Sequence, residues 1–304
     1  MSLRTPNTTQ YRQALLDLER TKGRIAQNQS RISTGNAISR PGDDPTSAAL
    51  ILDFGNSIQS NEQFLKQADS AASFLQSSEG IVETSINQVI RLQELAQQAT
   101  DSTLTATGRT ALSQQVDAIR THLLALANSQ EQGKYLFSGA QTQTQPFTDS
   151  APPAGPITYA GDSRSINLDV ASSTSVSTNV PGSTAFFGPG GIGSATDVFK
   201  AVTDLRDGLA TNNAAQIQTA TTNLKAVLDN LNQVQTDLGA RQAGLQDLQE
   251  GLTSVNVTLQ GLQSARQDTD YPQAITDYSN DQIVQSATLS ALAKTRQNLF
   301  DYLG

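Results

Sequence analysis

A leucine recurs at every seventh position in the last third of this 304-residue chain. The repeated leucines are Leu224, Leu231, Leu238, Leu245, Leu252 and Leu259. A second apolar position follows three residues later, occupied by Val227, Val234, Leu248, Val255 and Leu262, with Arg241 as an interruption. Apolar residues at these two positions of a seven-residue repeat form the contact stripe of a coiled coil. The repeat therefore predicts a long helix that packs along other helices.

Amphipathic helices are also predicted at both ends of the chain. Residues 8–34 carry one apolar stripe, which Lys22 and Gln29 interrupt, and Gly35 is a helix stop. Residues 273–303 form a last helix after a break at Pro272. The candidate subunit-assembly residues on the two stripes are Tyr11, Leu15, Leu18, Ile25, Ile32, Ile275, Ile283, Leu289, Leu292, Leu299 and Leu303. Narrow stripes of this kind favour helices that become ordered on assembly, although a single intramolecular coiled coil is an open alternative.

The middle of the chain changes character at residue 134. Helices are predicted at 45–100, at 107–132 with Gly133 as its end, and at 196–211. Most of the prolines lie between 134 and 195, where short runs alternate with a period of two. This stretch is predicted to be a β-rich insert, in which the turn-rich part 171–193 is expected to be partly mobile.

These patterns predict a mainly α fold, a long antiparallel helical coiled-coil bundle formed by the N- and C-terminal regions, with a small β-rich domain inserted in the middle. We expect residues 1–41 and 268–304 to form the terminal assembly region. Residues 42–133 and 196–267 would form the long bundle, and 134–195 the insert. Asp44 is the expected N-cap of the helix that begins at Pro45.

Charge and hydropathy exclude several classes of protein. A net charge of −8 argues against a nucleic-acid partner, because phosphate binding needs a basic surface. Residues 1–40 are basic and residues 264–304 acidic, so the two ends are expected to attract each other. No apolar run approaches the roughly 18 residues of a membrane span, and the first residues lack the apolar region of a secretory signal. We therefore expect no membrane partner, and any export would need another signal.

Few residues offer chemistry. The chain has one histidine, His122, and no cysteine, so a common zinc site is not expected. Gly188, Gly190 and Gly193 have the spacing of a dinucleotide-binding loop, but no βαβ pattern surrounds them. Asp268 and Asp270 resemble the start of a calcium loop, which Pro272 interrupts. We expect no catalytic residue, no metal and no cofactor.

Several motifs resemble a known family. The run RISTGNAISR at 31–40, followed by PGDDP at 41–45, is similar to the N-terminal signature of the flagellin superfamily. The DDP form, the run GKYLFSG at 133–139 and the ending QNLFDYL at 297–303 look like its hook-associated protein 3 (FlgL-type) branch. These motifs stand at both ends and in the middle, so the resemblance spans nearly the whole chain.

The resemblance implies a structural role in the bacterial flagellum. A protein of this branch joins the hook to the filament as a ring of subunits between the first hook-associated protein and flagellin. It is exported unfolded by the flagellar type III apparatus, with a cytoplasmic chaperone and without a cleaved signal peptide, and it works outside the cell. The terminal helices would line the inner tube, and the β insert would face outward.

Three other functions stay open. Filament flagellin belongs to the same class, although the DDP and DYL features argue against it. A soluble coiled-coil signalling protein would also have Gln- and Ala-rich helices. An enzyme would have to use the glycine loop at 188–193.

Overall fold

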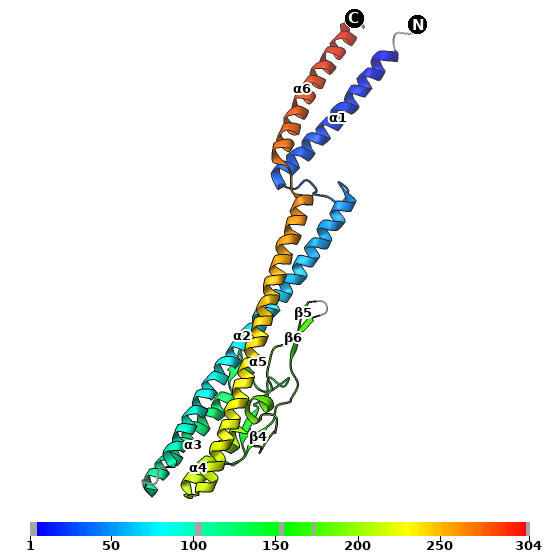
Figure 1. Cartoon of the computed structure of the whole chain (residues 1–304). Helices are drawn as coiled ribbons and strands as arrows, with labels where there is room; N and C mark the ends of the chain where they lie inside the picture. The colour runs from blue at the N-terminus through cyan, green and yellow to red at the C-terminus, as the bar shows by residue number, and fades with distance from the viewer. Residues whose placement is uncertain (1–4, 101–104, 152–154, 172–173, 302–304) are drawn as a thin grey trace. The chain divides into compact units, whose positions relative to one another are not determined.

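The computed structural model describes residues 5–100, 105–151, 155–171 and 174–301, and in these ranges the chain is mainly helical (Figure 1). The helices are α1 (Thr5–Thr34), α2 (Pro45–Ala99), α3 (Ala106–Ala127), α4 (Val198–Ala210), α5 (Ala214–Gln267) and α6 (Tyr271–Asp301), with a π-helical turn, η1 (Ser183–Phe187). The predicted fold class is confirmed.

The chain packs as two compact units. The terminal unit comprises residues 1–60 and 254–304, and the central unit comprises residues 61–253. Helices α2 and α5 each contribute residues to both units. The three-part division proposed from the sequence, with boundaries after residues 41, 133, 195 and 267, stays a prediction.

The heptad repeat forms the core of the central unit. Leu224, Leu231, Leu238 and Leu245 of α5 are all buried, and side chains from α2 and α3 bury against the same core. Arg241 interrupts the repeat because its guanidinium has another role. It donates to Ser177 Oγ (2.8 Å) and to the Asn179 carbonyl (2.9 Å), and so holds the end of strand β6 (Thr174–Ser177) against α5.

The β-rich segment consists of three antiparallel hairpins. They pair β1 (Gln130–Glu131) with β2 (Lys134–Tyr135), β3 (Phe147–Asp149) with β4 (Ile157–Tyr159), and β5 (Asn167–Ala171) with β6. Figure 1 shows β4, β5 and β6 beside the helices of the central unit.

The sequence had suggested that Gly133 ends a helix, and this prediction is wrong. Helix α3 already ends at Ala127, and the Asn128 side chain then bonds both the N–H and the carbonyl of Phe147, each at 2.9 Å. Gln132 and Gly133 have φ values of +50° and +76°. They form the two-residue turn of the β1–β2 hairpin, in which positive φ at both central residues is required.

An aromatic cluster joins the hairpins to the helices. Phe147 lies at its centre, with ring centroids 5.1–5.6 Å from Tyr159, Phe186, Phe187 and Phe199. Phe186 and Phe187 are fully buried, although the sequence had placed them in a stretch expected to be partly mobile. The reason is that η1 turns both rings inward. A turn of five residues is too short to show a periodic pattern in the sequence.

Helices α1 and α6 of the terminal unit lie side by side and antiparallel, with the two chain ends at the same end of the pair (Figure 1). The chain segments at the other ends of the two helices pair with each other. Thr269 N–H donates to the Gly35 carbonyl (2.8 Å) and Ala37 N–H to the Gln267 carbonyl (2.7 Å). Asp44 caps α2 as predicted, by accepting from Thr46 and Ser47 N–H and from Ser47 Oγ.

Candidate assembly surface

The contact between α1 and α6 buries mostly polar side chains. On α1 the buried side chains are Leu18, Thr21 and Asn28, and on α6 they are Ala274 and Asp281. Leu18 and Ala274 are therefore the two apolar members of this set. Hydrophobic stabilisation scales with the apolar area removed from water, so in this contact it comes from these two side chains and from the half-buried Ile25, Ile32 and Leu292.

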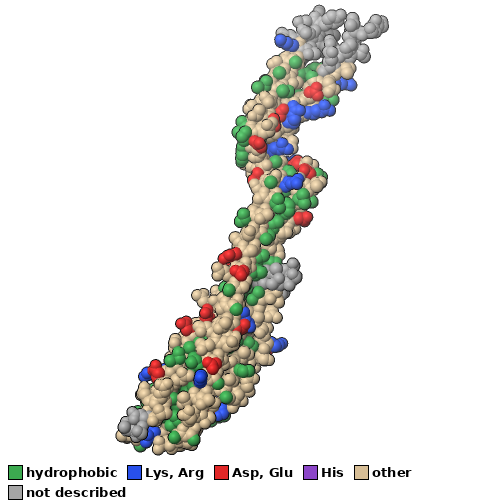
Figure 2. Space-filling model, viewed as in Figure 1, with side chains coloured by type: hydrophobic (Ala, Val, Ile, Leu, Met, Phe, Trp, Pro, Cys, Tyr) green, Lys and Arg blue, Asp and Glu red, His purple; other side chains and the backbone are tan. Residues whose placement is uncertain are grey.

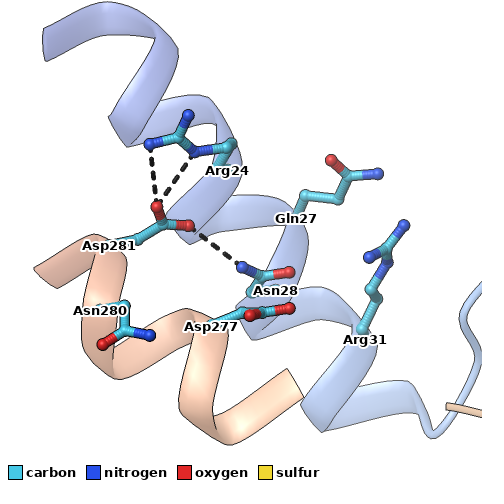
Figure 3. Close-up of a pocket in the computed structure, with 7 residues that line it drawn as sticks. All are labelled: Arg24, Gln27, Asn28, Arg31, Asp277, Asn280 and Asp281. Atoms are coloured by element: carbon cyan, nitrogen blue, oxygen red, sulfur yellow. Dashed lines mark hydrogen bonds and ion pairs between the residues drawn. The ribbon is translucent and has the colours of Figure 1, made fainter. Parts of the chain in front are cut away.

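Asp281 is the centre of a polar network between the two helices. Arg24 Nε donates to Asp281 Oδ1 at 3.0 Å, and Asn28 Nδ2 donates to Asp281 Oδ2 at 3.2 Å. The network lies in a polar pocket, shown in Figure 3, which is lined by Arg24, Gln27, Asn28, Arg31, Asp277, Asn280 and Asp281. These groups are amides, carboxylates and guanidinium groups, so the pocket aligns the two helices by hydrogen bonds and charge and has no apolar cavity for a ligand.

Several large apolar side chains of α6 are exposed. Ile275, Ile283, Val284 and Leu289 are between 44% and 67% exposed. Figure 2 shows apolar side chains along the surface of α6 and Lys or Arg side chains along α1. A helix pair that buries Asp281 and exposes Ile283 is poorly satisfied in an isolated molecule, and exposed apolar patches of this kind mark protein interaction sites.

The predicted assembly residues fall into four groups. Leu18 is buried between the helices, and Ile25, Ile32 and Leu292 are half-buried. Tyr11, Leu15, Ile275, Ile283 and Leu289 are exposed. The Leu299 side chain and all of Leu303 lie outside the described residues. The role of all these predicted assembly residues in contacts between subunits stays a prediction.

The sequence reading of α1 was wrong by one residue at two positions. Lys22 and Gln29, which had been assigned to the stripe, are exposed, and their neighbours Thr21 and Asn28 are buried instead. The spacing 18, 21, 25, 28, 32 is itself a regular heptad pattern. Counting the threonine and the asparagine as contact residues would have revealed this pattern in α1. Accepting polar contact residues in α6 as well would have pointed to Asp281, which lies seven residues after Ala274.

The other candidate sites have structural explanations. The Asp197 carboxylate occupies the N-terminus of α4, where a dinucleotide phosphate would bind. One of its oxygens accepts hydrogen bonds from the Phe199 and Lys200 N–H groups, and the other accepts one from the Gly193 N–H group. Burial raises the pKa of Asp197, and these hydrogen bonds oppose that rise. His122 is exposed on α3.

The described residues show neither a metal-binding cluster nor a helix suited to a membrane. Nowhere in these ranges do three or more His, Cys, Asp or Glu residues gather in a way that would hold a metal ion. Within the same ranges, none of the helices combines the length and the apolar character needed to cross a membrane.

Comparison with known proteins connects this architecture to the flagellum. The profile of the bacterial flagellin N-terminal helical region matches residues 7–142. Flagellar hook-associated protein 3 of Escherichia coli is 25% identical over 167 residues, which cover 55% of this chain and 51% of that protein. The same protein of Salmonella typhimurium is 26% identical over 146 residues, which cover 48% of this chain and 46% of that one. The chain thus matches about half the length of these relatives.

Solved structures share the fold. A flagellar hook-associated protein of Vibrio parahaemolyticus superposes with a TM-score of 0.68 and 16% identity, covering 74% of this chain and all of the other. Hook-associated protein 3 of Legionella pneumophila gives a TM-score of 0.62 and 19% identity, covering 71% of this chain and 99% of the other.

By its fold and these matches, the chain is similar to flagellin-type helical proteins. Within that class, the chain is similar in its motifs and in these matches to proteins of the hook-associated protein 3 type, as its sequence had indicated.

Proposed function

We propose that this chain is a structural subunit of the bacterial flagellum that joins the hook, through the first hook-associated protein, to the flagellin filament. It acts through helix-mediated assembly and needs no catalytic centre. Its partners would be the first hook-associated protein, flagellin, further copies of itself and an export chaperone. It would be exported without a cleaved signal peptide and would act outside the cell.

One observation carries this proposal: α6 buries a carboxylate against α1 while several of its large apolar side chains are exposed to solvent. Asp281 is buried against Arg24, whereas Ile283 is 67% exposed. Full burial of each leucine or isoleucine contributes about 1.5–3 kcal/mol. Several such contacts to neighbouring subunits would outweigh the cost of ordering the helices, so assembly would supply the stability that the isolated pair lacks.

The test uses Ile283→Gln combined with Leu289→Gln in cells that lack the wild-type gene. Both side chains are exposed, so the isolated protein should keep its helical content, and filament formation should fall sharply. The matched control is Ile192→Gln, which removes an apolar side chain that is 61% exposed in the central unit and should leave filaments unchanged. Normal filaments on cells carrying the double variant would refute the proposal.

A truncation tests the same proposal on a larger scale. Removal of residues 1–35 should leave a folded, monomeric central unit that does not restore filament growth. Copy number then separates a junction protein from filament flagellin. A junction protein is present in few copies for each flagellum, and its absence should release unassembled flagellin into the medium.

A further inference from the structure

The terminal unit is built from the two ends of the chain, whereas the central unit is one continuous stretch. Residues 61–253 form the central unit without a break, and the terminal unit joins 1–60 to 254–304. Helix α1 therefore has its packing partner, α6, at the opposite end of the sequence. Neither helix can complete this pairing before both ends of the chain are present.

The contacts between α1 and α6 close very long loops. The Asn28 side chain donates to Asp281 across 253 residues of sequence, and the Arg24 side chain donates to it across 257. Closing a loop costs conformational entropy, and the cost rises with the length of the loop. Among the described residues, the apolar side chains buried in this contact are Leu18 and Ala274, and others are half-buried. In an otherwise unfolded chain, we expect this mainly polar contact to be too weak to hold such a loop closed.

Folding of the central unit would shorten the loop. The two ends of this unit meet, since the Gln249 side chain of α5 donates to the Asp69 side chain of α2 at 2.8 Å. With the unit folded, only the segments 28–61 and 253–281 remain free between Asn28 and Asp281. Because the entropy of closure varies as three halves of the logarithm of loop length, this change favours the pairing of α1 with α6 roughly tenfold.

The central unit does not depend on the ends in return. Its hydrophobic core runs from Ala68 to Leu248, entirely within residues 61–253. Several of its contacts are close in sequence, and the hydrogen bond from Arg120 to Asp149 spans 29 residues. Contacts between residues that are close in sequence form faster than contacts between distant ones. The dependence between the two units should therefore run in one direction.

We infer that the pairing of α1 with α6 is the last step of folding and takes place only in a complete chain whose central unit has already folded. This inference rests on the proposed function, under which the chain leaves the cell unfolded. Whichever end of the chain emerges first, its helix waits for the other end. An incompletely exported subunit thus lacks the paired helices on which assembly depends, and only complete subunits are added.

The test follows the refolding of two single-tryptophan variants of the full-length chain after dilution from urea. The chain has no tryptophan of its own, so each variant reports on one place. Tyr278, on α6, is half-buried, and Phe74, on α2, packs against the central core. In stopped-flow fluorescence, we expect the Phe74→Trp signal to change first and the Tyr278→Trp signal to follow at least several times more slowly. Equal rates, or a faster Tyr278→Trp signal, would overturn the inference.

Matched truncations test the direction of the dependence. Leu231→Ala shortens a buried side chain of the central core, and Leu18→Ala shortens one in α1. In urea titrations, Leu18→Ala should move the Tyr278→Trp transition to lower urea and leave the Phe74→Trp transition in place. With Leu231→Ala, the Tyr278→Trp signal should be lost wherever the Phe74→Trp signal is lost, including the case in which the central unit does not fold at all.

Two results of these titrations would overturn the inference. The first is a native Tyr278→Trp signal in a chain whose Phe74→Trp signal is lost, because α1 and α6 would then pair without the central unit. The second is an equal shift of both transitions by Leu18→Ala, because the central unit would then depend on the ends. Both measurements use purified protein, so either result would leave the proposed function standing. Normal filaments on cells carrying Ile283→Gln with Leu289→Gln would refute the proposed function and leave the measured order of folding unchanged.

Discussion

At the scale of single residues, the buried ion pair of Arg120 and Asp149 constrains the central unit. Their charged atoms lie 2.7 Å apart, and the two side chains are 2% and 8% exposed. Arg120 also donates to the Gly155 carbonyl at 2.6 Å and to Thr203 Oγ1 at 3.2 Å. One guanidinium group thus fixes the β3–β4 hairpin against both α3 and α4.

Replacement of Arg120 by methionine should lower the free energy of unfolding by about 3–5 kcal/mol, because Asp149 would be left buried without its partner. The control is Arg164→Met, which removes an arginine that is 75% exposed beside Asp162 and should change stability by less than about 1 kcal/mol. Urea unfolding followed by circular dichroism measures both. Equal losses from the two variants would contradict a special role for the buried pair.

The same pair predicts how stability depends on pH. Burial tends to raise the pKa of Asp149, but the hydrogen bond from Arg120 and backbone N–H groups outweigh it and hold the pKa below its usual value. A carboxyl group with a lowered pKa in the folded state stabilises the protein above its unfolded-state pKa, and that contribution is lost as pH falls through the folded-state pKa. The stability difference between the wild-type protein and Asp149→Asn should therefore be constant at neutral pH and shrink below about pH 4. A difference that stays constant through the acid range would contradict this cause.

At the scale of elements, the end of α1 depends on one backbone conformation. Gly35 has a φ of +77°, and a Cβ atom there would lie 2.9 Å from the Tyr271 hydroxyl. Gly35→Ala should therefore destabilise the pairing of α1 with α6 by about 1–2 kcal/mol. Gly23→Ala is the matched change in the interior of α1, where a Cβ atom meets open space, and it should stabilise the helix by about 0.5–1 kcal/mol. Hydrogen exchange of α1 peptides in the full chain should shift in opposite directions for the two variants.

Elements also show what the sequence can and cannot predict. The heptad leucines of α5 and the cap at Asp44 were predictable because periodicity and capping are local. The polar contact of α1 with α6 was missed, because hydrophobic periodicity counts apolar residues, whereas Thr21, Asn28 and Asp281 are polar. The end of α3 was misplaced for a different reason, since Asn128 stops the helix by bonding Phe147, which lies 19 residues later.

At the scale of the whole molecule, stability should be unevenly distributed between the two units. The central unit buries a continuous core of leucine, valine and phenylalanine side chains. The paired helices α1 and α6 bury few apolar groups and several polar ones. Regions with few buried apolar contacts open at low free energy and exchange their amide hydrogens quickly.

Hydrogen exchange of the isolated subunit should therefore be much faster in α1 and α6 than around Leu231 and Leu238 of α5. On sheared flagella that contain the protein, exchange in α1 and α6 should slow strongly, because neighbouring subunits would then cover Ile275, Ile283 and Leu289. Exchange around Leu231 should change little between the two samples, since that core is already complete in one chain. Strong protection of α1 and α6 in the isolated subunit would contradict the idea that assembly completes these helices, since nothing would then be left for neighbours to stabilise.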